Sequence, residues 1–166
     1  VMAEQVVDAV KGAYALTLLG LNVTVPHKPQ VMKSVTELDP GAEAIGAVHT
    51  LVRTADGYQG YNTDADGLFR ALRGQGIDLK GESCILLGAG GAAKAAAYLL
   101  AREGAGEVYI LNRTRDKAER LAKEMNLRIG QSVMKGMAIT DWRELPDRRY
   151  LAIQTTSVGM HTDSGA

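Results

Sequence analysis

A glycine-rich turn constrains the fold of this chain more than any other part of its sequence. The turn reads Gly-Ala-Gly-Gly-Ala-Ala over residues 88–93. It follows a compact apolar run, Ser83 to Leu87, which predicts a buried strand, and it precedes an alanine-rich stretch, Ala92 to Arg102, which predicts a helix. A strand, a tight glycine turn and a helix in this order are typical of a parallel sheet that presents a helix N-terminus to a phosphate group.

The small residues of the turn have separate physical uses. Gly88 can make the tight turn, and Gly90 lets the backbone approach a pyrophosphate. Gly91 or Ala92 lets the helix pack closely on the strand. The alternative is a turn that only permits tight packing. The sequence therefore predicts a dinucleotide cofactor site that is formed by Gly88, Ala89, Gly90, Gly91 and Ala92.

More strands and helices follow at a regular spacing. Glu107 to Leu111 predicts a second strand and Thr114 to Met125 a second helix. Two further strands are expected at Met137 to Thr140 and at Leu151 to Thr155. Strands that alternate with helices favour an α/β fold with a doubly wound parallel sheet, here a Rossmann-like cofactor-binding domain.

The end of the second strand predicts which cofactor binds. Sites for NAD usually carry an acidic residue there, which bonds the ribose 2′-hydroxyl. This chain has Asn112, which does not repel a 2′-phosphate, and then Arg113, whose guanidinium can pair with that phosphate in a bidentate way. Thr114 can cap the helix and bond the phosphate, while Arg115 and Lys117 add positive charge. The alternative is a solvated basic helix start, although such charge is unfavourable for the helix alone. We therefore predict NADP as cofactor, bound by Asn112, Arg113, Thr114 and Lys117.

The first part of the chain predicts a smaller and different arrangement. A helix is expected from Glu4 to Leu19, a β-rich run from Leu21 to Val25 and a second helix over residues 29–35. Ala47 to Tyr61 is interpreted as a β-hairpin, and a helix from Asp64 to Arg73 leads to a glycine-containing stretch. We place a domain boundary there. It divides the chain into residues 1–73, part of a second α/β domain, and residues 74–166, the cofactor-binding domain.

Charge and cysteine content narrow the partners and the compartment. The 19 basic and 19 acidic residues balance, so nothing in the charge favours nucleic acid or an anionic membrane as partner. The chain has one cysteine, Cys84, which excludes an intrachain disulfide and fits a reducing, cytoplasmic compartment. No run is long and apolar enough to span a bilayer, and the first residues lack a signal-peptide pattern. His27 and His161 show no ligand spacing, so no metal is expected.

Several separate segments of the chain carry distinctive motifs. They are Asn22 to Lys28 (Asn-Val-Thr-Val-Pro-His-Lys), Ile45 to Leu51 (Ile-Gly-Ala-Val-His-Thr-Leu), Gly60 to Gly67 (Gly-Tyr-Asn-Thr-Asp-Ala-Asp-Gly), Gly88 to Ala93, Asn112 to Thr114 and Thr155 to Met160 (Thr-Thr-Ser-Val-Gly-Met). Considered alone, Lys28 is interpreted as a solvated lysine and Asp64 as a helix N-cap. Taken together, the segments resemble the shikimate dehydrogenase family. They come in the family's order and cover nearly the whole chain.

The resemblance implies roles for particular residues. Lys28 and Asp64 match the family's catalytic pair. Residues 1–73 then form part of the substrate-binding domain, and residues 74–166 an incomplete NADP-binding domain. Met160 is expected near the nicotinamide. The substrate contacts implied are Asn22, Thr24, His49 and Asp64.

The chain also departs from the family pattern. His49 and Gln154 each replace a usual asparagine, and both changes concern substrate specificity more than reaction type. An N-terminal strand and a C-terminal segment of the family are absent, so we expect a chain truncated at both ends.

The activity implied is reversible hydride transfer from NADPH to 3-dehydroshikimate, which gives shikimate in the pathway to aromatic amino acids. The site is expected in a cleft between the hairpin domain and the carboxyl edge of the sheet. The protein is expected as a monomer or homodimer. Three alternatives remain: a quinate/shikimate dehydrogenase paralogue, an NADP-binding fragment without activity, and a purely structural sheet protein with no ligand.

Overall fold

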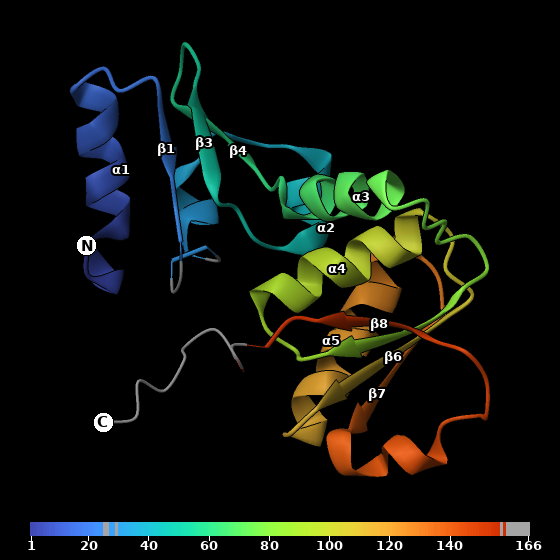
Figure 1. Cartoon of the computed structure of the whole chain (residues 1–166). Helices are drawn as coiled ribbons and strands as arrows, with labels where there is room; N and C mark the ends of the chain where they lie inside the picture. The colour runs from blue at the N-terminus through green and yellow to red at the C-terminus, as the bar shows by residue number, and fades with distance from the viewer. Residues whose placement is uncertain (25–26, 29, 157, 159–166) are drawn as a thin grey trace, which may run out of the picture. The chain divides into compact units, whose positions relative to one another are not determined.

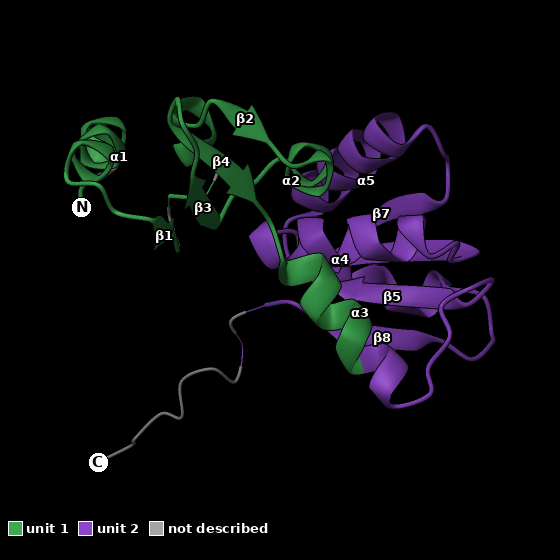
Figure 2. Ribbon diagram, turned by 90° about the horizontal axis from the view of Figure 1, so that it is seen from above, with its two compact units in different colours: residues 1–71 green, residues 72–166 purple. Residues whose placement is uncertain are grey.

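The chain folds into two compact units, residues Val1–Ala71 and Leu72–Ala166 (Figure 2). A computed structural model describes residues 1–24, 27–28, 30–156 and 158 (Figure 1). Each unit has its own four-stranded sheet. The helix that leads out of the first unit, α3 (Asp64–Gly74), contains the point of division.

The first unit combines a mixed sheet with short helices. Its strands lie in the order β1-β3-β4-β2, with β1–β3 and β3–β4 antiparallel and β2–β4 parallel. Its core gathers apolar side chains from α1, η2, α2 and the hairpin, among them Val10, Val31, Leu51 and Tyr58. The elements before α3 are η1 (Ala3–Gln5), α1 (Val6–Ala15), β1 (Gly20–Asn22), η2 (Val31–Ser34), β2 (Glu37–Leu38), α2 (Pro40–Ile45), β3 (Thr50–Arg53) and β4 (Tyr58–Tyr61).

The predicted hairpin is confirmed, but the first helix is shorter than predicted. β3 pairs with β4 in antiparallel register from Thr50–Tyr61 to Arg53–Tyr58. The helix expected to run to Leu19 ends at Ala15, because Thr17 takes a left-handed backbone conformation at φ 60°. Tyr58 donates its hydroxyl to the backbone oxygen of Leu18 at 2.8 Å, which ties the connection to the core.

Two short helices in this unit differ from the sequence prediction. The helix expected over residues 29–35 is a four-residue 3₁₀ turn, η2, and α2 was not predicted at all. α2 has clear end signals: Asp39 accepts hydrogen bonds from the N–H groups of Gly41 and Ala42, Pro40 opens the helix, and Gly46 closes it at φ 72°.

The second unit is built on a fully parallel sheet. Its strands lie in the order β7-β6-β5-β8. From β5 the chain moves outward to β6 and β7, and then returns to the other side of β5 as β8. This reversal is the doubly wound order, so the predicted fold class is confirmed. The elements are β5 (Ser83–Leu87), α4 (Gly91–Arg102), β6 (Glu107–Asn112), α5 (Arg115–Ile129), β7 (Met134–Ala138), η3 (Ile139–Glu144) and β8 (Leu151–Gln154).

The third strand of this sheet begins three residues before its predicted start, and α5 extends past Met125. Asn126 explains both changes, because its side chain accepts from the N–H of Met134 at 3.0 Å and donates to the Met134 oxygen at 2.9 Å. These bonds hold the end of α5 against the beginning of β7. The residues expected as the end of the strand, 139 and 140, belong instead to η3.

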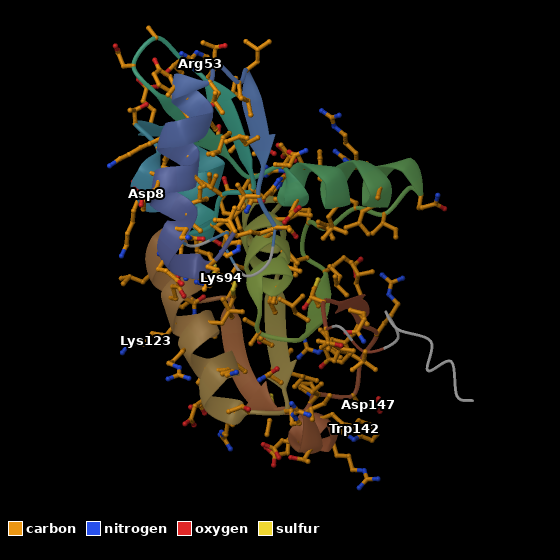
Figure 3. All side chains as sticks on the ribbon, turned by 90° about the vertical axis from the view of Figure 1, so that its left-hand side faces the viewer. Asp8, Arg53, Lys94, Lys123, Trp142 and Asp147 are labelled. Carbon is orange, nitrogen blue, oxygen red and sulfur yellow. The ribbon has the colours of Figure 1, made fainter. Side chains whose placement is uncertain are left out.

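The helices of the second unit pack closely because the residues beneath them are small. A Cβ at Gly136 of β7 would collide with the backbone of α5 at Ala118 and Glu119, so glycine is needed there. α4 buries mostly alanines against the sheet. Lys94 of α4, labelled in Figure 3, pairs with both carboxylate oxygens of Glu124 of α5 at 2.9 and 3.0 Å.

In the part of the chain that the structure describes, no helix is both long and apolar enough to cross a membrane.

Candidate functional site

A lysine and a carboxylate that lie 36 positions apart in the sequence form an ion pair in the first unit. Nζ of Lys28 lies 2.8 Å from Oδ2 of Asp64. The side chains are 21% and 38% exposed, so the pair is accessible to a ligand and still partly shielded from water. The backbone oxygen of Lys28 accepts from the N–H of Val48 at 3.0 Å, which anchors the lysine next to the hairpin.

Asp64 is held at the first residue of α3 by a buried asparagine. Asn62, 5% exposed, accepts from the N–H of Asp64 at 3.1 Å and donates to the oxygen of Ala47 at 3.0 Å. The expectation that Asp64 caps the helix is wrong: Asp64 is the first residue inside α3, and its carboxylate points to Lys28 instead. The local bonds therefore free this carboxylate for the ion pair.

The ring of His49 lies beside this ion pair. Its Nε2 lies 3.3 Å from Oδ1 of Asp64 and 2.9 Å from the backbone nitrogen of Thr63. Its Nδ1 lies 2.9 Å from Oγ1 of Thr50, whose hydroxyl reaches Oδ1 of Asn22 at 3.4 Å. Hydrogen bonds thus link Asn22 on β1, through Thr50 and His49, to the backbone of Thr63, which directly precedes Asp64.

One predicted substrate residue stands apart from this chain of contacts. Thr24 and Asn22 line a pocket of about 240 Å³ between α1, β1 and η2, whose walls are mostly apolar.

The side chains of Asn62, Thr50 and Thr63 were not predicted as site residues. The sequence signal for Asn62 was its position two residues before a helix start, where a side-chain amide can accept a backbone N–H.

The glycine turn of the second unit offers an open backbone cradle. Gly88 has φ +113°, which L side chains rarely adopt, and a Cβ there would lie 2.7 Å from Oγ1 of Thr155. Positions 90 and 91 face open space. Gly90 is the N-cap of α4 and has no side chain to bond the first N–H groups of the helix. These groups and the helix dipole fit a pyrophosphate.

The turn also lies at the carboxyl ends of the strands, where a dinucleotide would bind. β5 ends at Leu87 and β8 at Gln154, and the strand order reverses between these two strands. Ligands of open α/β sheets bind at the carboxyl ends of the strands at such a reversal. The residues present in the second unit therefore fit a dinucleotide.

The end of β6 leaves one guanidinium unpaired. Among the residues that the structure describes, Arg113 forms no ion pair, and its side chain is exposed. Arg115 is instead engaged by Glu119 at 2.7 Å and Asp141 at 3.6 Å, which offsets the charge predicted there. Asn112 donates its amide to the oxygen of Thr114 at 2.9 Å. Of the two guanidinium groups at this turn, that of Arg113 is therefore the one available to a 2′-phosphate.

The remaining predicted contacts have mixed outcomes. Thr114 occupies the N-cap position of α5, but its side chain makes no capping bond, so that part of the prediction is wrong. Lys117 follows in the first turn of α5, with an exposed side chain. Met160 lies outside the described residues. Within the described ranges, no three His, Cys, Asp or Glu side chains gather as metal ligands would.

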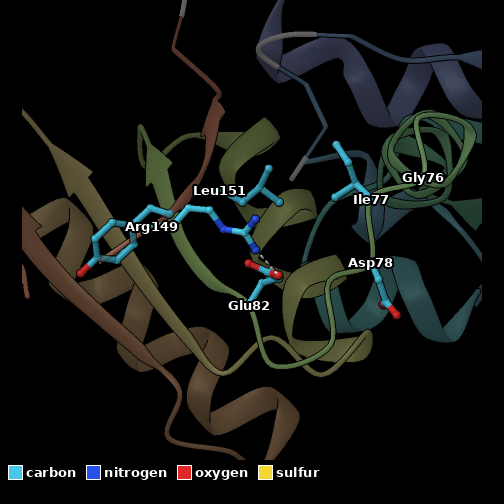
Figure 4. A pocket seen from close by; sticks show the side chains of 7 residues that line it. Gly76, Ile77, Asp78, Glu82, Arg149 and Leu151 are labelled. Atoms are coloured by element: carbon cyan, nitrogen blue, oxygen red, sulfur yellow. Dashed lines mark hydrogen bonds and ion pairs between the residues drawn. The ribbon is translucent and has the colours of Figure 1, made fainter. Parts of the chain in front are cut away.

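A separate hollow of the second unit lies at the amino ends of the strands, opposite the glycine turn. It measures about 420 Å³ and is lined around Ile77, Glu82 and Arg149, before the start of β5 and β8 (Figure 4). Nη2 of Arg149 forms an ion pair with Oε1 of Glu82 at 2.9 Å, so these two charged side chains of the hollow neutralise each other. This hollow lacks the backbone donors of the glycine turn, and we assign it no part in the chemistry.

Comparison with known proteins gives matches in both units. Residues 1–51 match the family model of the shikimate dehydrogenase substrate binding domain, and residues 71–139 match that of shikimate / quinate 5-dehydrogenase. The chain is 45% identical over 163 residues to a shikimate dehydrogenase (NADP(+)) of Methanopyrus kandleri, covering 95% of this chain and 55% of that protein.

Solved structures agree with these matches. A shikimate dehydrogenase crystallised in complex with NADP+ has a TM-score of 0.86 at 34% identity, covering 100% of this chain and 57% of that one. A quinate dehydrogenase from Corynebacterium glutamicum in complex with NAD has a TM-score of 0.80 at 29% identity, covering 91% and 54%. The chain thus spans little more than half the length of the relatives that it matches.

Proposed function

Because the chain belongs to the shikimate dehydrogenase family, we propose that it carries the catalytic pair and the cofactor turn of an enzyme that reduces 3-dehydroshikimate to shikimate with NADPH. The sequence resemblance is thereby confirmed at the level of the family. The activity, the substrate and the cofactor of the whole protein are the proposal, because the chain covers 55% of its relative from Methanopyrus kandleri.

The observation that carries the proposal is the ion pair of Lys28 and Asp64 at 2.8 Å. NADPH, when bound, supplies the hydride that adds to the ketone carbon of 3-dehydroshikimate. Negative charge then develops on the ketone oxygen. The ammonium of Lys28 stabilises that oxygen and gives it a proton, so that a hydroxyl forms.

Asp64 has two proposed tasks beside the lysine. Its Oδ2 orients the ammonium, while a neighbouring substrate hydroxyl can donate to the same carboxylate. In the reverse direction, the neutral amine of Lys28 would accept the hydroxyl proton, and the hydride from the carbon would pass to NADP+ when that cofactor is bound.

We assign the substrate contacts to Asn22, Thr24, His49 and Asp64. The hydrogen bonds that lead from Asn22 through Thr50 and His49 to Thr63, next to Asp64, support three of these assignments. His49 also favours a second candidate function, a quinate/shikimate dehydrogenase, since an imidazole differs from an amide in reach and in hydrogen-bonding pattern.

We assign NADP binding to the turn and to the end of β6. The open first turn of α4 supports the pyrophosphate contacts of Gly88, Ala89, Gly90, Gly91 and Ala92. The unpaired side chain of Arg113 supports 2′-phosphate binding together with Asn112, Thr114 and Lys117, and Met160 is proposed near the nicotinamide.

We place the enzyme in the cytoplasm, in the route to aromatic amino acids, as a monomer or homodimer. Its lone, buried cysteine supports a reducing compartment.

The test uses the chain alone and a chimera in which the flanking segments of the Methanopyrus kandleri relative extend it to full length. NADP+ binding to the chain is measured by calorimetry, and absorbance at 340 nm follows the chimera with shikimate or quinate and with NADP+ or NAD+. We expect reduction of NADP+ with shikimate to be preferred. A chimera that binds NADP+ but oxidises neither acid would refute the substrate assignment, while a preference for quinate would establish the second candidate.

A further inference from the structure

One backbone oxygen at the entrance of the glycine turn receives two hydrogen bonds from a single residue. The oxygen of Leu87, the last residue of β5, lies 2.6 Å from Oγ1 of Thr155 and 2.9 Å from its backbone nitrogen. The N–H bond continues the ladder between β5 and β8, but the hydroxyl bond is additional. Both lone pairs of this carbonyl are therefore used.

The other side of the same peptide is also held. The N–H of Gly88 donates to the oxygen of Leu111 on β6 at 2.8 Å. The peptide that joins Leu87 to Gly88 is thus fixed from β6 on one side and from the segment after β8 on the other. It is the last peptide before the chain leaves the sheet, so its orientation sets the direction of the turn that follows.

Thr155 also occupies the space that glycine leaves free. A Cβ at position 88 would lie 2.7 Å from Oγ1 of Thr155, which is closer than real Cβ contacts. Thr155 is itself followed by a locally bonded turn, in which Oε1 of Gln154 accepts from the N–H of Thr156 at 3.0 Å. The hydroxyl therefore fits against Gly88 from a defined position and does not approach it from a free loop.

We propose that Thr155 is a positioning residue for the cofactor: its hydroxyl fixes the peptide before Gly88, so that the N–H groups of residues 90–92 face the pyrophosphate of NADP. This inference rests on the proposed cofactor site and names a residue outside the turn as a determinant of its geometry. Thr155 acts through the Leu87 oxygen and needs no contact with the cofactor.

The experiment compares Thr155→Val, which keeps the branched shape and removes the hydroxyl, with Thr155→Ser, which keeps the hydroxyl. The matched control is Thr140→Val, at an exposed threonine of η3 whose hydroxyl donates to the neighbouring Asp141. The dissociation constant for NADP+ is measured by calorimetry on the 166-residue chain, and the midpoint of thermal unfolding is measured without ligand.

We expect Thr155→Val to weaken NADP+ binding by about three- to tenfold, the size of one lost neutral hydrogen bond, while Thr155→Ser and Thr140→Val stay within about twofold of the parent. In the chimera, the KM for NADP+ should rise and the KM for shikimate should not. A lower unfolding temperature with unchanged NADP+ affinity would show a purely structural role and overturn the inference. If Thr155→Val does not fold, Thr155→Ala is read by the same affinity criterion. A parent chain that fails to bind NADP+ overturns the cofactor assignment and this inference together.

Discussion

His49 accepts a hydrogen bond from the backbone of Thr63, with 2.9 Å between Nε2 of the ring and the amide nitrogen. An atom that accepts an N–H bond carries no proton of its own, so the neutral ring has its proton on Nδ1, where Oγ1 of Thr50 lies 2.9 Å away. The ring therefore joins β3 to the residue that precedes α3. His49 supports the position of Asp64 in addition to any contact that it makes with substrate.

Replacing His49 by alanine should therefore affect stability as well as specificity. His49→Ala removes both ring bonds and is expected to lower the free energy of unfolding by about 1–3 kcal/mol, measured by urea denaturation. His27→Ala is the control, because the His27 ring makes one exposed bond to Gln30 at 3.3 Å. Equal effects of the two substitutions would contradict the proposed support.

Removing the ammonium of Lys28 should impair the chemical step. Lys28→Ala is expected to lower kcat of the full-length chimera by roughly 10²–10⁴-fold, because general acid–base help is lost. Lys33→Ala, an exposed lysine of η2, should leave kcat unchanged. Turnover within a factor of a few of the parent after Lys28→Ala would exclude the catalytic role.

The two glycines of the turn should separate folding from cofactor binding. Gly88→Ala places a methyl group against Thr155 at φ +113° and is expected to lower the free energy of unfolding by about 1–3 kcal/mol. Gly90→Ala places its methyl group in open space and should leave stability nearly unchanged. It should still weaken NADP+ binding, since the methyl lies where the pyrophosphate approaches. Full NADP+ affinity in Gly90→Ala would argue against that placement.

Cofactor preference should depend on Arg113 and not on its neighbour. Arg113→Ala is expected to reduce the preference for NADP+ over NAD+ by about 10- to 100-fold, the loss of a charge-assisted bond. Arg115→Ala should change the preference little, because Glu119 and Asp141 already hold that guanidinium. The ratio of kcat/KM values for the two cofactors measures both. A larger effect at position 115 would reverse the assignment.

The thiol of Cys84 should be unreactive toward labelling reagents in the folded protein. Burial, with a smaller contribution from the charge of Glu82, raises the pKa of its thiol to about 11. At pH 8, well below that pKa, the thiol stays protonated, and the thiolate is the form that reacts. Labelling with a chromogenic disulfide reagent should therefore be slow in buffer and fast in denaturant. Rapid labelling of the folded chain would show that β5 opens readily.

The parallel sheet and the turn could be predicted because their signals are local. The apolar run of Ser83 to Leu87 and the glycines after it determine a strand and a turn without help from distant residues. α2 was missed because its six residues are too few to show a helical period, although Asp39, Pro40 and Gly46 mark its ends. The first helix was predicted too long because Leu18 continues the apolar pattern of Val10 and Tyr14, although it lies beyond the end of α1 and is exposed.

The polar contacts of the site depend on tertiary structure and could be predicted only in part. Lys28 and Asp64 were identified through the family resemblance, and the distance between them is a product of the fold. Nothing local indicates that Thr155 reaches the oxygen of Leu87, 68 positions earlier, or that Asn62 donates to the oxygen of Ala47, 15 positions earlier. Such bonds arise when strands far apart in sequence become neighbours.

Gly136 determines how closely α5 packs on the parallel sheet. Because α5 lies directly on the backbone of β7 at this glycine, the height of the helix above the sheet is set by a residue that follows Arg113 by more than twenty positions. A bulkier residue at 136 would lift α5, and with it the loop that presents the guanidinium. Selection or engineering that changes nucleotide preference therefore has a second target, in a strand that carries none of the residues assigned to the nucleotide.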